Sequence, residues 1–182
     1  MGDSDSLQSS SDNTVSAVER ETSYVGLTKE TIKSADAINF LTTPSSGAIN
    51  LFLGVTRQDE IDSDGNTSGQ VTSLYYESYE AMAIKMMNRL VKHTIDKFKL
   101  NKCYVIHRLG LVKLCEASIL IGCSSAHRQA AHEATYYLLN QIKKIIPIWK
   151  RINGSEEPEF EQSYSTWSSR SEAFWLPRSS ES

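Results

Sequence analysis

Basic residues lie at the start of a long predicted helix. The apolar, β-branched run of residues 117–123 is typical of a buried strand. Ser124 and Ser125 after it are good N-cap residues, which places His127 and Arg128 in the first turn of the following helix. At that position, free backbone N–H groups and the positive end of the helix dipole add to the side-chain charges. A phosphate or carboxylate is therefore the expected ligand.

The end of the same helix is basic as well. Lys143 and Lys144 fall in its predicted last turn, Pro147 ends it, and Lys150 and Arg151 follow on what we expect to be an exit loop. The helix dipole favours a last-turn lysine in any protein, so Lys143 taken alone is more often structural than catalytic. Basic residues at both ends together point more strongly to an anion-binding site.

Composition narrows the classes of protein. The chain has 182 residues, of which 40% are hydrophobic, and this is enough for one globular domain but not for two. The net charge of −3 gives no general attraction to nucleic acid or to anionic membranes. No apolar run is long enough to span a bilayer and the N-terminus has no signal-peptide core, so we expect a soluble intracellular protein.

The three cysteines do not suggest a metal site or a disulfide framework. Cys103, Cys115 and Cys123 are an odd number, and their spacing fits neither pattern. Cys103 and Cys123 lie in apolar, strand-like runs, where we expect buried, inert thiols.

The pattern of apolar residues predicts the order of the elements. Strands are expected at residues 22–27, 47–55, 70–78, 102–108 and 117–123, and helices at residues 34–41, 80–98 and from about 127 to the proline at 147. This order predicts an α+β sandwich in which helices pack on one side of a mixed or antiparallel sheet. The strand at 47–55 is too apolar to be half-exposed and is expected at the centre of the sheet, with Arg57 just beyond its end.

Three polar segments are expected outside the regular elements. Residues 1–21 are rich in serine and aspartate and are expected to form a disordered leader. Residues 58–69 are acidic and contain glycine, which predicts a flexible loop. Residues 153–182 form a polar tail that we expect to be partly ordered. Its aromatic residues are of the kind that dock onto the protein's own surface or onto a partner's, namely Tyr164, Trp167, Phe174 and Trp175.

Several short blocks have the order and spacing of the catalytic (large) subunit family of molybdopterin synthase, which the chain resembles over roughly residues 47–151. The most specific blocks are Ser124 to Arg128 and Pro147-Ile148-Trp149-Lys150. The remaining matches are Gly47-Ala48 with Phe52, Gly54 and Arg57, then Tyr76-Glu77-Ser78-Tyr79, His107-Arg108-Leu109-Gly110 and Glu133. In the tail, Ser165-Thr166-Trp167 and Phe174-Trp175 are similar to the eukaryotic branch of the family.

The resemblance implies a fold and an activity. The fold would be a hammerhead-like α/β sandwich with a small additional β subdomain, and residues 22–152 would form the catalytic domain. The activity would be sulphur transfer from the thiocarboxylated C-terminus of a small ubiquitin-like subunit to cyclic pyranopterin monophosphate, which forms the dithiolene of molybdopterin. No metal or redox cofactor is implied. The assembly would be a cytosolic heterotetramer built on a homodimer of the large subunit.

The resemblance also implies roles for individual residues. Lys143 matches the lysine regarded as catalytic, and we assign it as general acid/base. Lys150 matches the second active-site lysine and is assigned to substrate or thiocarboxylate binding. Arg57, His127 and Arg128 match phosphate-binding positions, and Arg151 completes the substrate-binding set. The chain departs from the family at Ile152, where an acidic residue is common, and at Gln58-Asp59-Glu60, which lacks the usual asparagine.

The length of the helix limits how these residues can meet. Arg128 and Lys143 are separated by about 22 Å along a helix that rises 1.5 Å per residue. If both ends line one pocket, the simplest arrangement is a twofold dimer in which His127 and Arg128 of one chain complete the pocket that holds Arg57, Lys143 and Lys150 of the other.

Two other functions fit parts of the pattern. A non-catalytic adaptor would keep the groove for a ubiquitin-like tail, but it would lose the phosphate-binding residues, which are all present here. An unrelated phosphate-ester enzyme is less well supported, because no nucleophile or metal-binding cluster accompanies the basic residues.

Overall fold

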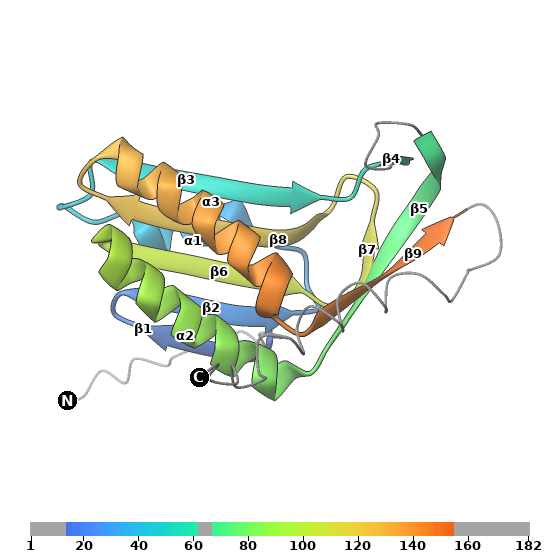
Figure 1. The fold of residues 1–182 in the computed structure, drawn as a ribbon, viewed down its shortest axis with the longest axis horizontal. Coiled ribbons are helices and arrows are strands. Elements are labelled where there is room, and N and C mark those ends of the chain that lie inside the picture. Colours follow the sequence, from blue (N-terminus) through green and yellow to red (C-terminus); the bar gives the residue numbers. More distant parts are fainter. Residues whose placement is uncertain (1–13, 62–66, 155–182) are drawn as a thin grey trace, which may run out of the picture.

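The computed structural model describes residues 14–61 and 67–154. They form an α+β fold with two sheets and three helices (Figure 1). The elements are β1 (Thr14–Arg20), β2 (Ser23–Thr28), α1 (Ser34–Leu41), β3 (Ala48–Val55), β4 (Asp59–Ile61), β5 (Thr67–Ser78), α2 (Glu80–Phe98), β6 (Lys102–Arg108), β7 (Gly110–Lys113), β8 (Ala117–Ser125), α3 (Arg128–Ile145) and β9 (Ile148–Gly154). No helix in these ranges is long and apolar enough to cross a membrane.

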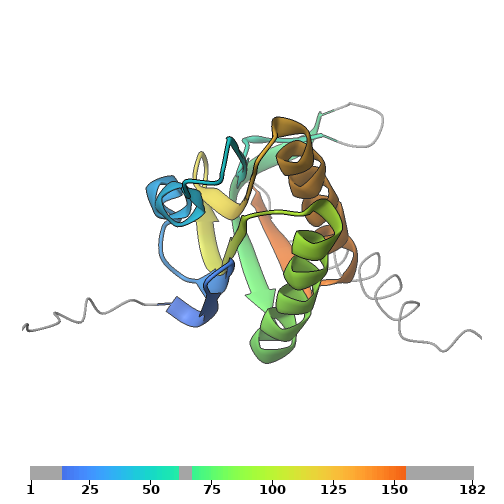
Figure 2. The same cartoon turned by 90° about the vertical axis from the view of Figure 1, so that its left-hand side faces the viewer.

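The larger sheet is mixed, as the sequence predicts. Its strand order is β1-β2-β6-β8-β3, with β2 and β6 parallel and the other neighbours antiparallel. The two long helices α2 and α3 cover one face, whereas the short α1 lies on the opposite face (Figure 2). The prediction of helices on one side is therefore right for the long helices and wrong for α1.

Alternating side chains on β6 explain why both faces carry helices. Cys103 and Val105 belong to the core under α2 and α3, and Tyr104 and Ile106 belong to the smaller core under α1. Since successive side chains of a strand point to opposite faces, the continuous apolar run at residues 103–106 needs cover on both faces.

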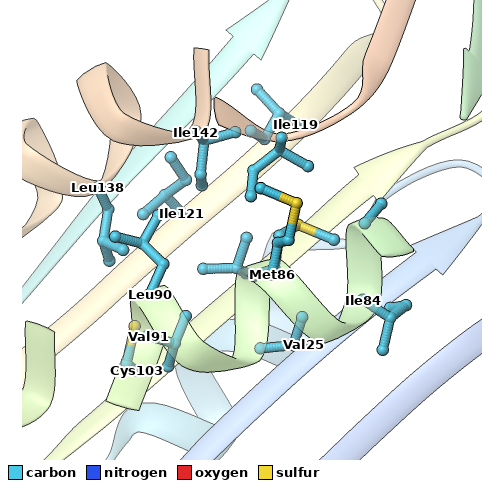
Figure 3. Packing of buried hydrophobic residues seen from close by; sticks show 14 of the residues in the cluster. Val25, Ile84, Met86, Leu90, Val91, Cys103, Ile119, Ile121, Leu138 and Ile142 are labelled. Carbon is cyan, nitrogen blue, oxygen red and sulfur yellow. The ribbon is translucent and has the colours of Figure 1, made fainter. Parts of the chain in front are cut away.

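The main core lies between the larger sheet and the two long helices (Figure 3). Leu138 of α3 and Val91 of α2 pack there with Ile121 of β8, and all three are almost fully buried. Met86 and Met87 belong to the same cluster. Cys103 and Cys123 are buried, as expected, and their Sγ atoms lie 4.0 Å apart without a disulfide bond.

The smaller sheet is built around β5. This strand pairs with β4 near its start, with β9 over residues 71–78 and with β7 over residues 73–76. In Figure 1 its first half projects beyond the larger sheet, alongside the end of the antiparallel strand β9. Lys150 and Arg151 lie within β9 and not on an exit loop, because Pro147 ends α3 and the chain then turns back to pair with β5.

Three sequence expectations are corrected by the strand pairing. β3 is an edge strand and not a central one, and β6 and β8, which are buried over most or all of their length, lie inside the sheet. Part of the expected leader forms β1, because its backbone pairs with β2 and Val18 packs against the core. The loop expected at 58–69 includes β4 and the start of β5. Residues 1–13, 62–66 and 155–182, with the tail aromatics, lie outside the described residues.

We expect Leu138→Ala to lower the free energy of unfolding by about 3 kcal/mol, because it opens a cavity in the main core. Ile38→Ala is the matched control, since 43% of Ile38 is exposed on α1, and it should cost less than about 1 kcal/mol. Urea denaturation of both variants measures the difference. Equal losses would contradict the placement of the core.

Candidate active site

A pocket of about 620 Å³ lies where the end of β3, the end of α3 and the strands β5 and β9 meet. Three of its lining residues are cationic, namely Arg57, Lys143 and Lys150. We call this the main pocket. Its walls are largely apolar and include Phe52, Leu53, Val55, Ile142 and Ile148.

Each cation of the main pocket comes from a different segment. Arg57 follows the end of β3, and its Nε donates a hydrogen bond to the carbonyl oxygen of Asp59 (2.9 Å). Lys143 lies in the last turn of α3, as predicted. Lys150 is on β9, directly opposite Tyr76 of β5. The fold therefore brings together residues that are 93 positions apart in the sequence, from 57 to 150.

The other two predicted phosphate-binding residues lie elsewhere. His127 and Arg128 line a separate hollow with Gln129, His132 and Glu133, which we call the helix-start hollow. His127 is the N-cap of α3 and Arg128 its first residue, so both occupy the predicted end of the helix. Neither lines the main pocket of the same chain.

The serines at the start of α3 do not cap it. Ser124 and Ser125 are buried at the end of β8, which is longer than expected. The Ser125 hydroxyl donates to the carbonyl oxygen of His127 (2.7 Å), and the N-cap residue makes no side-chain capping hydrogen bond. Ser125 therefore helps to fix the path of the chain into the helix, whereas the Ser124 hydroxyl accepts a hydrogen bond from the backbone N–H of Lys102 in β6 (3.2 Å).

Arg151 is not among the residues that line the main pocket. Its guanidinium lies over the ring of Tyr75, 5.0 Å from the centroid. Its neighbours Lys150 and Ile152 do line the pocket, because alternate residues of a strand point to opposite faces. Two residues at which the chain departs from the resembled family also line the pocket: Ile152, and Asp59 of the segment Gln58-Asp59-Glu60.

Uncharged polar residues line the main pocket beside the cations. They are Tyr76, His107 and Ser118, and the sequence analysis did not assign them to the site. His107 is 7% exposed, and its Nδ1 lies 2.8 Å from the carbonyl oxygen of Arg108. Its ring meets that of Tyr76 edge to face, with the centroids 4.9 Å apart. One feature of the sequence could have indicated that His107 belongs to the site: it lies at the end of a predicted strand, within a block that resembles the family.

Burial shifts the pKa of two of these residues. It lowers the pKa of His107 to about 4, although the hydrogen bond with the Arg108 carbonyl acts in the opposite direction. It raises the pKa of Tyr76, and a hydrogen bond with Ser118 offsets part of this effect. Both side chains are therefore neutral near pH 7.

This arrangement can bind an anion and move a proton. Three cations at one pocket attract a phosphate or carboxylate, and a lysine within reach of the bound ligand can donate or accept a proton. Within residues 14–61 and 67–154, no group of three or more His, Cys, Asp or Glu side chains is placed to hold a metal ion.

Comparison with known proteins identifies the family of this chain. Residues 27–145, more than half of the chain, match the model of the MoaE protein family. The chain belongs to the MoaE family. A molybdopterin synthase catalytic subunit from Thermoplasma volcanium is 43% identical over 128 residues, which are 70% of this chain and 89% of that protein. The human molybdopterin synthase catalytic subunit is 35% identical over 162 residues, which are 88% of this chain and 79% of that protein.

Solved MoaE structures have the same fold. The crystal structure of molybdopterin synthase from Staphylococcus aureus is 25% identical with a TM-score of 0.66, and the match covers 76% of this chain and 95% of that one. A complex of subunits 1 and 2 of molybdopterin-converting factor from Helicobacter pylori is 18% identical with a TM-score of 0.61, over 76% of this chain and 92% of that one. The predicted α+β class is thereby confirmed.

The lowered pKa of His107 predicts a specific dependence of stability on pH. The unfolded chain binds a proton at His107 near pH 6.5 and the folded chain only near pH 4, so this residue stabilises the fold less as the pH falls from 6.5 towards 4. Between pH 7 and pH 5, the wild type should lose about 2 kcal/mol more unfolding free energy than His107→Gln, which cannot titrate. Denaturation curves at both pH values test this, and parallel losses would show that His107 is not buried in its neutral form.

Proposed function

We propose that this chain is the catalytic subunit of a molybdopterin synthase. As a MoaE family member it has a role in molybdopterin biosynthesis. The proposed reaction is sulphur transfer from the thiocarboxylated C-terminus of a small ubiquitin-like subunit to cyclic pyranopterin monophosphate, which forms the dithiolene. The observation that carries this proposal is the convergence of Arg57, Lys143 and Lys150 on one pocket.

The cations of the main pocket suit the chemistry of this reaction. Opening a cyclic phosphate and replacing oxygen by sulphur requires neutralisation of negative charge and a proton donor or acceptor. We assign Lys143 as the general acid/base, because it is the lysine in the last turn of α3 that lines the main pocket. Lys150 on β9 and Arg57 after β3 would hold the phosphate and the thiocarboxylate on either side of it.

The pocket walls support binding of a peptide tail. Phe52, Leu53 and Val55 give β3 an apolar surface beside the cations, which suits an extended chain that ends in an anion. The Helicobacter pylori structure of the same fold is a complex of two subunits. We propose that a small ubiquitin-like subunit inserts its C-terminus here, and that two large and two small subunits form a cytosolic heterotetramer.

The human relative supports assignment to the eukaryotic branch of the family. Its alignment covers 88% of this chain, against 70% for the archaeal relative, although the archaeal protein has the higher identity. The assignment is thus based on the greater share of this chain that aligns with the human protein.

If the active site is shared between two copies of the chain, the residues of the helix-start hollow can contribute to it. About 22 Å of helix separates Arg128 from Lys143, and the two residues line different cavities of one chain. We propose that His127 and Arg128 of a second copy approach the main pocket across a twofold axis and bind the substrate phosphate. The adaptor hypothesis is less well supported, because Arg57, His127 and Arg128 are all present.

Lys143→Ala should reduce formation of the dithiolene product at least about 100-fold, because the general acid/base is lost, while the small subunit still binds. Lys144→Ala is the matched control, since Lys144 is also in the last turn of α3 but does not line the main pocket. The assay combines the protein, a thiocarboxylated small subunit and the pterin precursor. Turnover by Lys143→Ala at the rate of Lys144→Ala would refute the assignment.

The shared site predicts complementation between two inactive variants. In a mixed dimer of Arg128→Ala and Lys143→Ala, one site would contain both changes and the other would contain neither. Mixing the variants should therefore restore up to about half of the activity per mixed dimer. If both residues act within one chain, every site stays defective and the mixture remains inactive. Mixed dimers isolated by two affinity tags provide the measurement.

A further inference from the structure

The main pocket contains a neutral hydrogen-bond acceptor in addition to its cations. We propose that Nε2 of His107 binds an N–H group of a reactant and thereby fixes its orientation in the pocket. This inference rests on the proposed function, because that function defines which reactants enter the pocket. It adds His107 to the substrate-binding residues assigned above.

The hydrogen bond between His107 and the Arg108 carbonyl determines which ring nitrogen can accept a hydrogen bond from a ligand. Nδ1 lies 2.8 Å from the Arg108 carbonyl oxygen, and a carbonyl oxygen can only accept a hydrogen bond. Nδ1 must therefore carry the proton of the neutral ring, and Nε2 has the lone pair. Nε2 makes no hydrogen bond with any residue of the described part of the chain, and His107 lines the main pocket.

The surroundings of His107 hold its ring in one orientation. Tyr76 packs against it edge to face at 4.9 Å, and the strand register places Lys150 opposite Tyr76. The hydroxyl of Ser118 donates to the Gly54 carbonyl oxygen (3.2 Å), which ties β8 to β3 at the same wall. A side chain that is 7% exposed and fixed at both its ring face and Nδ1 is well suited to a directional contact.

The charge of His107 decides what kind of ligand it takes. Burial lowers its pKa to about 4, so at neutral pH it adds no positive charge to the three cations of the pocket. A neutral acceptor does not attract phosphate or carboxylate, which Arg57, Lys143 and Lys150 can bind. It binds an uncharged donor, and both proposed reactants have one: the pterin ring has N–H groups and the peptide tail has backbone amides.

Two substitutions separate the hydrogen bond from the packing. In His107→Asn the side-chain amide can still donate to the Arg108 carbonyl, but nothing remains at the position of Nε2. In His107→Gln the longer side chain can place an amide oxygen near that position. His93→Asn is the matched control, because His93 is exposed on α2 and does not line the main pocket.

Binding to the full-length protein is measured by calorimetry with three probes: inorganic phosphate, a phosphate-free pterin, and a short peptide that ends in glycine. We expect His107→Asn to weaken binding of either the pterin or the peptide about tenfold. The probe whose binding is weakened identifies the reactant that donates its N–H group to His107. His107→Gln should restore binding to within about threefold of the wild type. His93→Asn should bind all three probes normally, and phosphate binding should be the same in every variant.

Three results would overturn the inference. The first is wild-type affinity of His107→Asn for both the pterin and the peptide, and the second is failure of both probes to bind the wild type. The third is an equal loss in His107→Asn and His107→Gln at wild-type melting temperature, because it would show a role in packing only. A wild type that binds a probe through His107 but makes no dithiolene product would instead refute the proposed function alone.

Discussion

The length of α3 is the constraint on which the rest of the site depends. A helix of 18 residues is about 27 Å long, so the basic residues at its start and end cannot contact one small ligand. Positive charge near Lys143 must therefore come from other segments. The fold supplies it as Arg57, which follows an edge strand of the larger sheet, and as Lys150, which is on the smaller sheet. The main pocket lies where the two sheets and the helix end meet.

Pro147 and the register of β9 determine which basic residue reaches the pocket. Pro147 cannot continue α3, so the chain turns and pairs antiparallel with β5. This pairing places Lys150 at the pocket and Arg151 over Tyr75. A slip of one residue would exchange the two side chains, since neighbouring residues of a strand face opposite ways. The β5 and β9 pair is thus as important to the site as the helix itself.

Local sequence patterns correctly predicted the features that depend on local interactions, such as the bounds of helices. The periodicity of apolar residues gave α1 and α2 with the observed bounds and located the last turn of α3. The failures concern strand pairing, including the hairpins β1–β2 and β4–β5, and the face of the sheet that α1 covers. β3 was predicted to be central because it is apolar, but part of its apolar surface lines the main pocket. β1 was missed because a strand held mainly by backbone hydrogen bonds at a sheet edge needs few apolar side chains.

His107 shows why the candidate site was only partly predictable. A strand-end histidine usually contributes to packing, and this one does pack against Tyr76. Only the fold shows that the same residue also lines the pocket that holds the three cations. A protonated imidazole there would be repelled by them, whereas burial keeps the ring neutral and leaves one nitrogen as an acceptor. Burial is therefore the cause of the neutral charge on which the proposed role in binding depends, and the position of a single histidine in the sequence does not reveal it.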